Sequence, residues 1–484
     1  MTPASPGPAL VIHGHFYQPP REDPWTDVVP EQPSAAPFHD WNERITAECY
    51  GPLGDVPLDD GSRVNVYEHL SFNMGPTLLS WLEAHHPDVY GRIIAADQVT
   101  GRAIAQAHSH SILPLCNDHD LHTQLEWGIR DFRHRFGRMP EGLWMPETAT
   151  SERVLAALAE HGVQFTIVAP HQLDRARPLD GSAGWHEVGD DGRAPAIDRS
   201  YRWCHPDDPE LGLDLVVYDG PLAQSLAFGD PSAEAIVGAA LAHDAGRRGV
   251  IVAATDGETF GHHRKGAERQ LARVFASEAA AQGVATPRLL DHLRSQPATH
   301  QATVRTSAWS CAHGIGRWVR DCGCRTGGDE GWDQAWREPL RNALDRFRDW
   351  GSEVMDRRGP ELLVDQWAAR DEYIDVLIGA CPWEAWAADH VRGDLDQART
   401  LLEAQRFGLL MYTSCGWFFN DLAGIETVQI LQYAARSMDL YRELGEVPEV
   451  EVFLDELARA RSNDPAAGDG RQVWHDHVDG ARPR

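Results

Sequence analysis

Hydrophobic positions in the first two thirds of the chain gather into short runs that are separated by amphipathic stretches. Six apolar runs have the length of β-strands and end in polar clusters, at residues 9–13, 112–115, 142–145, 163–168, 213–218 and 250–253. Helical periodicity covers residues 123–136, 152–161 and 266–282, and the second of these helices has Ser151 as its N-cap and Gly162 as its stop. Strands that alternate with helices indicate an α/β fold with a parallel sheet, either closed into a barrel or doubly wound.

The pattern changes near Trp332 from alternating elements to long helices. Amphipathic periodicity covers residues 334–357, 360–379, 393–407 and 425–444. It predicts an α-helical domain over residues 331–462, after an α/β domain over residues 1–330. Residues 175–212 are rich in Gly, Pro and Asp, and we expect a long loop or hairpin there, a candidate lid over the site. The tail over residues 463–484 is polar and rich in Gly and Asp, which predicts disorder.

Charge and composition narrow the range of partners. The chain of 484 residues has 44 basic and 73 acidic side chains, and its net charge of -29 repels phosphate backbones and anionic lipid. We therefore expect no nucleic acid and no membrane as partner, and a neutral substrate instead. No apolar stretch reaches the ~18 residues of a membrane span, and the N-terminus lacks a signal-peptide pattern. Eight cysteines in a chain of this length do not suggest a disulfide framework, so the predicted compartment is the cytoplasm.

The 17 tryptophans are the most unusual feature of the composition. Indole rings stack on the apolar faces of sugars while Nε1–H donates to a hydroxyl, so a carbohydrate is a fitting partner. A tryptophan-rich core is the alternative explanation for any single Trp. The sequence gives no prediction of the oligomeric state.

Two histidines stand directly after the first predicted strand. His13 and His15 are two positions apart, and side chains with this spacing in a strand point to the same side. Such a pair binds a metal, donates hydrogen bonds to sugar hydroxyls, or forms part of a buried core. The sequence alone leaves all three interpretations open.

Two carboxylates also follow predicted strands. Glu147 ends a Trp-Met-Pro-Glu motif, and Asp256 opens an Asp-Gly-Glu-Thr-Phe-Gly-His motif. The carboxyl ends of parallel strands carry the chemistry of such folds, so these two side chains could meet at one edge of the sheet. Hydrolysis of a glycosidic bond needs two carboxyl groups, one that attacks or stabilises the anomeric centre and one that donates a proton. Either carboxylate taken alone could instead cap a helix.

Together with the His-x-His pair, these motifs resemble glycoside hydrolase family 57. The resemblance implies an incomplete (β/α)7 barrel followed by a helical region, and a retaining glycosidase or glycosyl-transferring enzyme that acts on α-glucan as an amylase, glucanotransferase or branching enzyme. It also implies that Glu147 is the nucleophile and Asp256 the general acid/base, that His13 and His15 bind sugar, and that no cofactor is needed. Within the family the chain is most similar to a subgroup whose C-terminal domain is uncharacterised.

Further candidate sugar contacts lie near these motifs and in later polar-aromatic segments. They are Gln18, Trp144, Asp118, Gln124, Glu258, His262, Trp309, His313 and Trp417. Asp118 stands in a Cys-Asn-Asp-His-Asp segment that departs from the commoner family pattern. For Trp417 a core aromatic cluster is an equal alternative.

Three cysteines and a histidine lie within 14 positions: Cys311, His313, Cys322 and Cys324. These are zinc ligand types, but the Cys-x-Cys spacing is tighter than that of the common fingers. A structural metal and a redox pair are alternatives. We expect a substrate-binding loop with incidental thiols, and no metal.

Two other classes of function fit parts of the pattern. A metal-dependent hydrolase of the amidohydrolase kind also has His-x-His after its first strand and an Asp at a late strand end. It would need further strand-end histidines, whereas His262 and His263 lie past the strand in a glycine-flanked loop. A non-catalytic carbohydrate-binding protein of the same fold is the second alternative, although such proteins usually lose a catalytic carboxylate and both are present here.

Overall fold

The computed structural model describes residues 8–188, 196–197, 199–243 and 249–482. The chain divides into two compact units, which are described separately. The first, the barrel unit, comprises Met1–Gln18, Glu31–Gln106 and Phe132–Trp309. The second, the helical unit, comprises Pro19–Pro30, Ala107–Asp131 and Ser310–Arg484.

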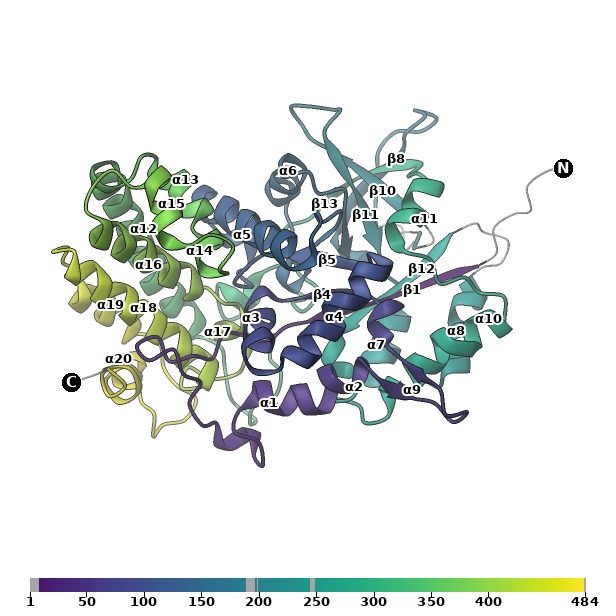
Figure 1. The fold of residues 1–484 in the computed structure, drawn as a ribbon, viewed down its shortest axis with the longest axis horizontal. Coiled ribbons are helices and arrows are strands. Elements are labelled where there is room, and N and C mark those ends of the chain that lie inside the picture. The colour runs from purple at the N-terminus through teal and green to yellow at the C-terminus, as the bar shows by residue number, and fades with distance from the viewer. Residues whose placement is uncertain (1–7, 189–195, 198, 244–248, 483–484) are drawn as a thin grey trace. The chain divides into compact units, whose positions relative to one another are not determined.

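Seven parallel strands form the centre of the barrel unit (Figure 1). Their spatial order is β12 (Val250–Asp256), β1 (Ala9–Phe16), β4 (Ser71–Met74), β5 (Ala103–Gln106), β6 (Leu143–Trp144), β7 (Phe165–Val168) and β11 (Gly212–Val217). A single parallel bridge between Gly142 and Phe165 joins β6 to β7. At the other end, the N–H of Asp219 after β11 donates to the carbonyl of Val252 on β12. The predicted incomplete (β/α)7 barrel is confirmed.

The strands are held by apolar packing on both faces. Every residue of β1 is buried, and so are the first six residues of β12, which matches the continuous hydrophobic runs typical of parallel sheets. Among the helices of this unit, α6 (Glu152–Glu160) begins as predicted, because Oγ of Ser151 accepts a hydrogen bond from the N–H of Val154. It ends before Gly162, whose φ of 77° is a conformation that glycine adopts without strain.

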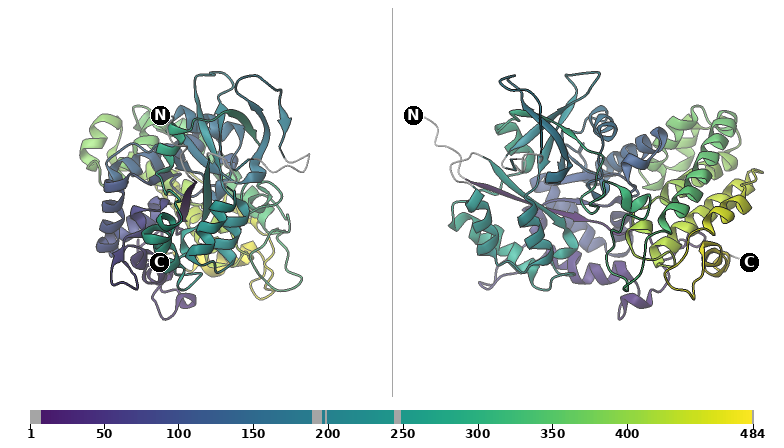
Figure 2. Two further views of the ribbon diagram at one scale, coloured as in Figure 1. Left: turned by 90° about the vertical axis from the view of Figure 1, so that its right-hand side faces the viewer. Right: turned by 180° about the vertical axis from the view of Figure 1, so that it is seen from behind.

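The segment expected to be a long loop or hairpin contributes several short strands to a second sheet, joined by turns and irregular stretches. From β11 this sheet continues through β10 (Ser200–Cys204), β13 (His300–Val304), β8 (Leu173–Pro178) and β9 (His186–Glu187) (Figure 2). Tyr201 and Trp203 are buried at alternate positions of β10, a period of two that the content of Gly and Pro in this segment conceals. Residues 189–195 and 198 of the segment lie outside the described residues.

A correction concerns the apolar run at residues 112–115. It forms a short 3-10 turn, Leu113–Leu115, rather than a strand, since Pro114 fixes its own φ and lacks an N–H for a ladder. Two strands of the barrel, β4 and β5, are absent from the sequence prediction. Both have only four residues, too short for a clear alternation.

The helical unit is built mainly from long helices, as predicted. Its main members are α12 (Arg337–Leu362), α16 (Leu395–Leu410), α18 (Ile425–Glu443) and α19 (Val450–Leu457). α16 packs on α12 and α18, and α12 also packs on α19 (Figure 1). No helix in the described part of the chain has the length and apolar character needed to cross a membrane.

Residues 464–482 of the tail are folded, whereas the sequence predicts disorder. They include α20 (Gly470–Trp474) and a short π-helical turn, His475–Asp479. Trp474 is buried and packs against Phe453 with 5.2 Å between ring centroids. The few apolar residues of this polar segment are therefore enough to anchor it on α19.

Candidate active site

The candidate catalytic residues of the barrel unit lie at the carboxyl ends of neighbouring parallel strands. His15 near the end of β1 is paired in register with Asp256 at the end of β12 and with Asn73 on β4. Trp144 ends β6, and Glu147 follows it after a short turn. The structure thus brings His13, His15, Trp144 and both carboxylates to one edge of the sheet.

His13 is fully buried and both of its ring nitrogens are bonded. Nδ1 lies 3.0 Å from Oγ of Ser71, and Nε2 lies 3.0 Å from Oδ1 of Asn73. Its ring stacks on Trp144 with 4.8 Å between centroids. His13 therefore supports the layer beneath the site.

His15 stacks on the same indole, at 5.0 Å, and its Nδ1 lies 2.9 Å from Nδ2 of Asn73. Oδ1 of the same amide lies 3.3 Å from Nδ1, so Asn73 can bond either tautomer of the neutral ring. Burial lowers the pKa of His13 to about 4 and, together with the charge of His13, lowers the pKa of His15 to about 3. Both imidazoles are neutral at pH 7, a form that donates and accepts hydrogen bonds as sugar hydroxyls require.

Glu147 stands in a left-handed backbone conformation, with φ 57° and ψ 22°. The next residue, the β-branched Thr148, also has a positive φ, 47°. Such conformations cost about 1–3 kcal/mol each and persist where the surroundings fix them. Trp309 provides that support: its backbone N–H donates to the carbonyl of Glu147 at 3.0 Å, and its indole Nε1–H donates to Oε2 of the same carboxylate at 3.0 Å.

Asp256 is exposed to water at the end of β12, as a group that touches substrate must be. Protein atoms nevertheless surround the strand end closely, and this desolvation, with the charges of Glu258 and Glu147, raises the pKa of Asp256 well above its usual value. The charge of Asp256 in turn contributes to the pKa of Tyr218, which burial raises to about 12. Tyr218 packs edge-on against Trp309, the partner of Glu147.

Glu258 is buried behind the strand end. Its Oε1 accepts a hydrogen bond from the hydroxyl of Tyr50 at 2.6 Å and one from the N–H of Tyr17 at 3.1 Å. Burial raises the pKa of Glu258 to about 7. The side chain holds the turn after Asp256 in place, and its predicted contact with substrate stays a prediction.

The other predicted contacts of the barrel unit also have protein partners. Nε2 of Gln18 donates to the carbonyl of Tyr17, and Nδ1 of His262 is bonded to Glu48, which also pairs with Lys265 at 3.2 Å. Trp144 is fully buried under the two histidines. Trp144 is the platform on which His13 and His15 stack, and its direct contact with sugar stays a prediction.

Four predicted contacts belong to the helical unit. Trp417 is fully buried and its Nε1–H donates to the carbonyl of Arg337, which fits the alternative of a core aromatic residue. Gln124 is buried and its Oε1 accepts from the N–H of Ser109. Asp118 is exposed at the start of α5 (Asp118–Phe136), and Nδ1 of His313 lies 3.5 Å from Sγ of Cys324.

Several residues of the site were missed by sequence reasoning: Asn73, Ser71, Tyr50, Tyr17 and Tyr218. Asn73 and Ser71 lie on β4, a strand too short to predict. Tyr218 ends a predicted apolar run and is the one that strand-end position could have identified.

The arrangement does not match a metal-dependent hydrolase. In the described part of the chain, the one cluster of His, Cys, Asp and Glu side chains with the spacing of metal ligands is Cys311, His313, Cys322 and Cys324. It does not include His13 or His15. The ring nitrogens of the strand-end pair lie within hydrogen-bonding distance of Ser71 and Asn73 instead.

Two carboxyl groups and two neutral imidazoles lie at the carboxyl ends of the barrel strands. This arrangement is typical of (β/α)-barrel enzymes that use acid–base chemistry. The model of glycosyl hydrolase family 57 matches residues 21–298, more than half of the chain, and the chain belongs to this family. A second model, described as a domain of unknown function (DUF3536), matches residues 332–483. The helical unit therefore corresponds for the most part to a domain without an assigned role.

Individual relatives are distant in sequence and close in fold. Alpha-amylase 1 of Dictyoglomus thermophilum is 27% identical over 92 residues, which are 19% of this chain and 13% of that protein. The structure of an exo-type maltose-forming amylase from Pyrococcus sp. ST04 matches with a TM-score of 0.72 at 12% identity, over 98% of this chain and 88% of that one. A family 57 branching enzyme from Pyrococcus horikoshii matches with a TM-score of 0.56 at 16% identity, over 98% and 96% of the two chains.

Proposed function

We propose that the protein is a retaining enzyme that cleaves or transfers α-linked glucan, with Glu147 as nucleophile and Asp256 as general acid/base. The observation that carries this proposal is the difference between the two carboxyl groups. The pKa of Asp256 is raised, which suits a group that donates a proton, while Glu147 accepts an indole hydrogen bond that stabilises its charged form. An acid and a nucleophile side by side are what a double displacement needs.

In the first step, an oxygen of Glu147 bonds to the anomeric carbon while Asp256 gives its proton to the departing glycosidic oxygen. A covalent glycosyl-enzyme and an ionised Asp256 result. In the second step, Asp256 takes a proton from water or from a sugar hydroxyl, which attacks the same carbon and releases Glu147. Two inversions give net retention of the α configuration.

The substrate class is inferred from relatives and from the chemistry of the site. The similar proteins include an amylase, a maltose-forming amylase and a branching enzyme. The neutral imidazole of His15 and the exposed Asp256 suit uncharged hydroxyl-bearing ligands. The cytoplasmic location also stays our proposal, and the eight free cysteines fit a reducing compartment.

The test is an activity screen on glycogen and maltooligosaccharides, with products identified by chain length and linkage. We expect wild-type turnover of at least one of these substrates, and a loss of about a thousandfold or more in Glu147→Gln, because an amide cannot attack the anomeric carbon. The matched control is Glu160→Gln on the exposed surface of α6, which should keep wild-type activity. Full activity of Glu147→Gln would overturn the assignment, and turnover confined to β-linked substrates would overturn the substrate class.

A further inference from the structure

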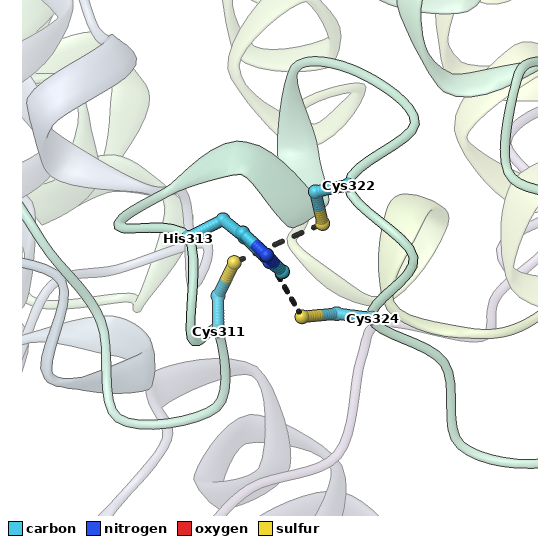
Figure 3. A group of neighbouring side chains, drawn as sticks. All are labelled: Cys311, His313, Cys322 and Cys324. Atoms are coloured by element: carbon cyan, nitrogen blue, oxygen red, sulfur yellow. Dashed lines mark hydrogen bonds between the residues drawn. The ribbon is translucent and has the colours of Figure 1, made fainter.

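Three thiols and an imidazole converge in the helical unit, in the segment between Trp309 and α12 (Figure 3). Their candidate ligand atoms all lie within 4.8 Å of one another. Sγ of Cys311 is 3.9 Å from Sγ of Cys322, and Sγ of Cys324 is 3.5 Å from Nδ1 of His313. In Figure 3 the four side chains point toward a common centre from two arms of the loop.

These distances agree with the edges of a zinc tetrahedron. Zinc binds thiolate at about 2.3 Å and imidazole at about 2.0–2.1 Å, so tetrahedral geometry separates two sulfurs by about 3.8 Å and a sulfur from a nitrogen by about 3.6 Å. We propose that Cys311, His313, Cys322 and Cys324 bind one zinc ion in a closed structural site. A set of four protein ligands leaves no open position for substrate, which distinguishes the site from a catalytic zinc.

The chain around these four residues has little regular secondary structure, as is common where a metal ion stabilises a loop. Within the described residues, no helix or strand lies between Trp318 and Arg337. Local side chains bond parts of its backbone: Asp321 accepts from the N–H of Gly323, and Asn420 accepts from the N–H of Thr326. A zinc ion would link the two arms of this loop, whose ligands are separated by about ten residues of sequence.

A buried arginine complements the charge of such a site. Three thiolates and one zinc ion carry a net charge of about −1. The guanidinium of Arg337 is buried, and its Nη1–H donates to the carbonyl of Cys324 at 2.9 Å. A cation bonded to the backbone of a ligand residue stabilises the anionic centre and fixes the ligand's position.

The two alternatives from the sequence fit this geometry less well. A redox pair would need two cysteines whose sulfurs can reach about 2.05 Å, but it would leave the third thiol and the imidazole without a reason to converge. A loop with incidental thiols would not bury Cys311, which is 2% exposed, within reach of three other ligand atoms. The tight Cys-x-Cys spacing is compatible with zinc because the other two ligands come from the opposite arm.

The test is metal analysis of the full-length protein purified without a metal-affinity column. We expect about one zinc per chain in the wild type, loss of the zinc in Cys324→Ser and in His313→Ala, and retention in His313→Cys, which restores a four-thiolate set. The matched control is Cys381→Ser, whose thiol is bonded to the carbonyl of Pro382 outside the cluster. It should keep the zinc.

A second measurement covers the case in which a variant does not fold. Metal-free wild-type protein is titrated with cobalt(II), and we expect the visible absorption of a tetrahedral thiolate site. A chelator should lower the melting temperature of the wild type and of Cys381→Ser, since metal binding is coupled to folding. A folded wild-type protein that binds neither zinc nor cobalt would overturn the proposal, and so would full zinc occupancy in a folded Cys324→Ser variant. Two fewer titratable thiols before reduction than after it, with no metal, would identify a disulfide instead.

Discussion

At the scale of single residues, the site combines a strained backbone at Glu147 with the support of a tryptophan ring. Glu147 has a left-handed backbone, and Trp309 bonds both its carbonyl and its carboxylate. On the other side, Trp144 and Asn73 fix the ring of His15. Pre-organisation of this kind places the nucleophile before substrate arrives, so less of the binding energy is lost in ordering it.

Trp309→Phe tests this support. The variant keeps an aromatic ring but loses the indole N–H that donates to Glu147 at 3.0 Å. A hydrogen bond to a charged group contributes about 1.5–3 kcal/mol, so we expect kcat to fall about tenfold to a hundredfold with a smaller change in KM. Steady-state kinetics on a maltooligosaccharide provides both constants. Trp367→Phe is the control, because its indole donates to Asp356 in the helical unit. An unchanged kcat in Trp309→Phe would remove this residue from the mechanism.

At the scale of elements, short parallel strands decide where the chemistry lies. β1 and β12 pair in register over seven positions, and this pairing places His15 opposite Asp256. Sequence reasoning found these two strands because they are long, continuous and apolar. It found the strand before Glu147 as well, and the carboxyl-end rule then identified the catalytic candidates.

The elements that were missed or misread share a physical cause. β4 spans four residues, and its two polar members, Ser71 and Asn73, face the buried histidines rather than water. Its four residues do alternate between polar and apolar, but four positions are too few to distinguish a strand from a loop. The strands of the second sheet were not predicted because Gly, Pro and Asp interrupt their pattern. The helix in the C-terminal tail was not predicted because most of its residues are polar. The burial of Trp144 and Trp417 could not be predicted, because sequence cannot distinguish a buried indole from an exposed one.

At the scale of the whole molecule, a buried carboxyl group should make stability depend on pH. Burial raises the pKa of Glu258 to about 7 in the folded state, against 4.5 for the free group. Between pH 4.5 and about pH 7, Glu258 keeps its proton in the folded state and has lost it in the unfolded state. Stability is therefore highest at the acidic end of this range and declines as pH rises through about 7, by about 3 kcal/mol in total from this group. The raised pKa of Asp256 acts in the same direction.

Denaturant unfolding between pH 5 and pH 8 measures this effect. We expect the free energy of unfolding of the wild type to fall over this range, and the fall to be smaller in Glu258→Gln, whose side chain cannot ionise. Glu160→Gln should show the wild-type dependence. If Glu258→Gln and the wild type have the same pH dependence, the proton on Glu258 is not a source of it.

The proposed mechanism requires a covalent bond between the sugar and Glu147, and this bond can be trapped. In Asp256→Asn, an α-glucosyl fluoride needs no acid to depart, so the first step proceeds, while the second step lacks its base and the intermediate accumulates. Rapid quenching, proteolysis and mass spectrometry then locate the sugar. We expect one hexosyl unit on the peptide that contains Glu147, bound to that residue. Turnover of the fluoride with the sugar on a different residue, or with a β-anomer as first product and no covalent species, would contradict it.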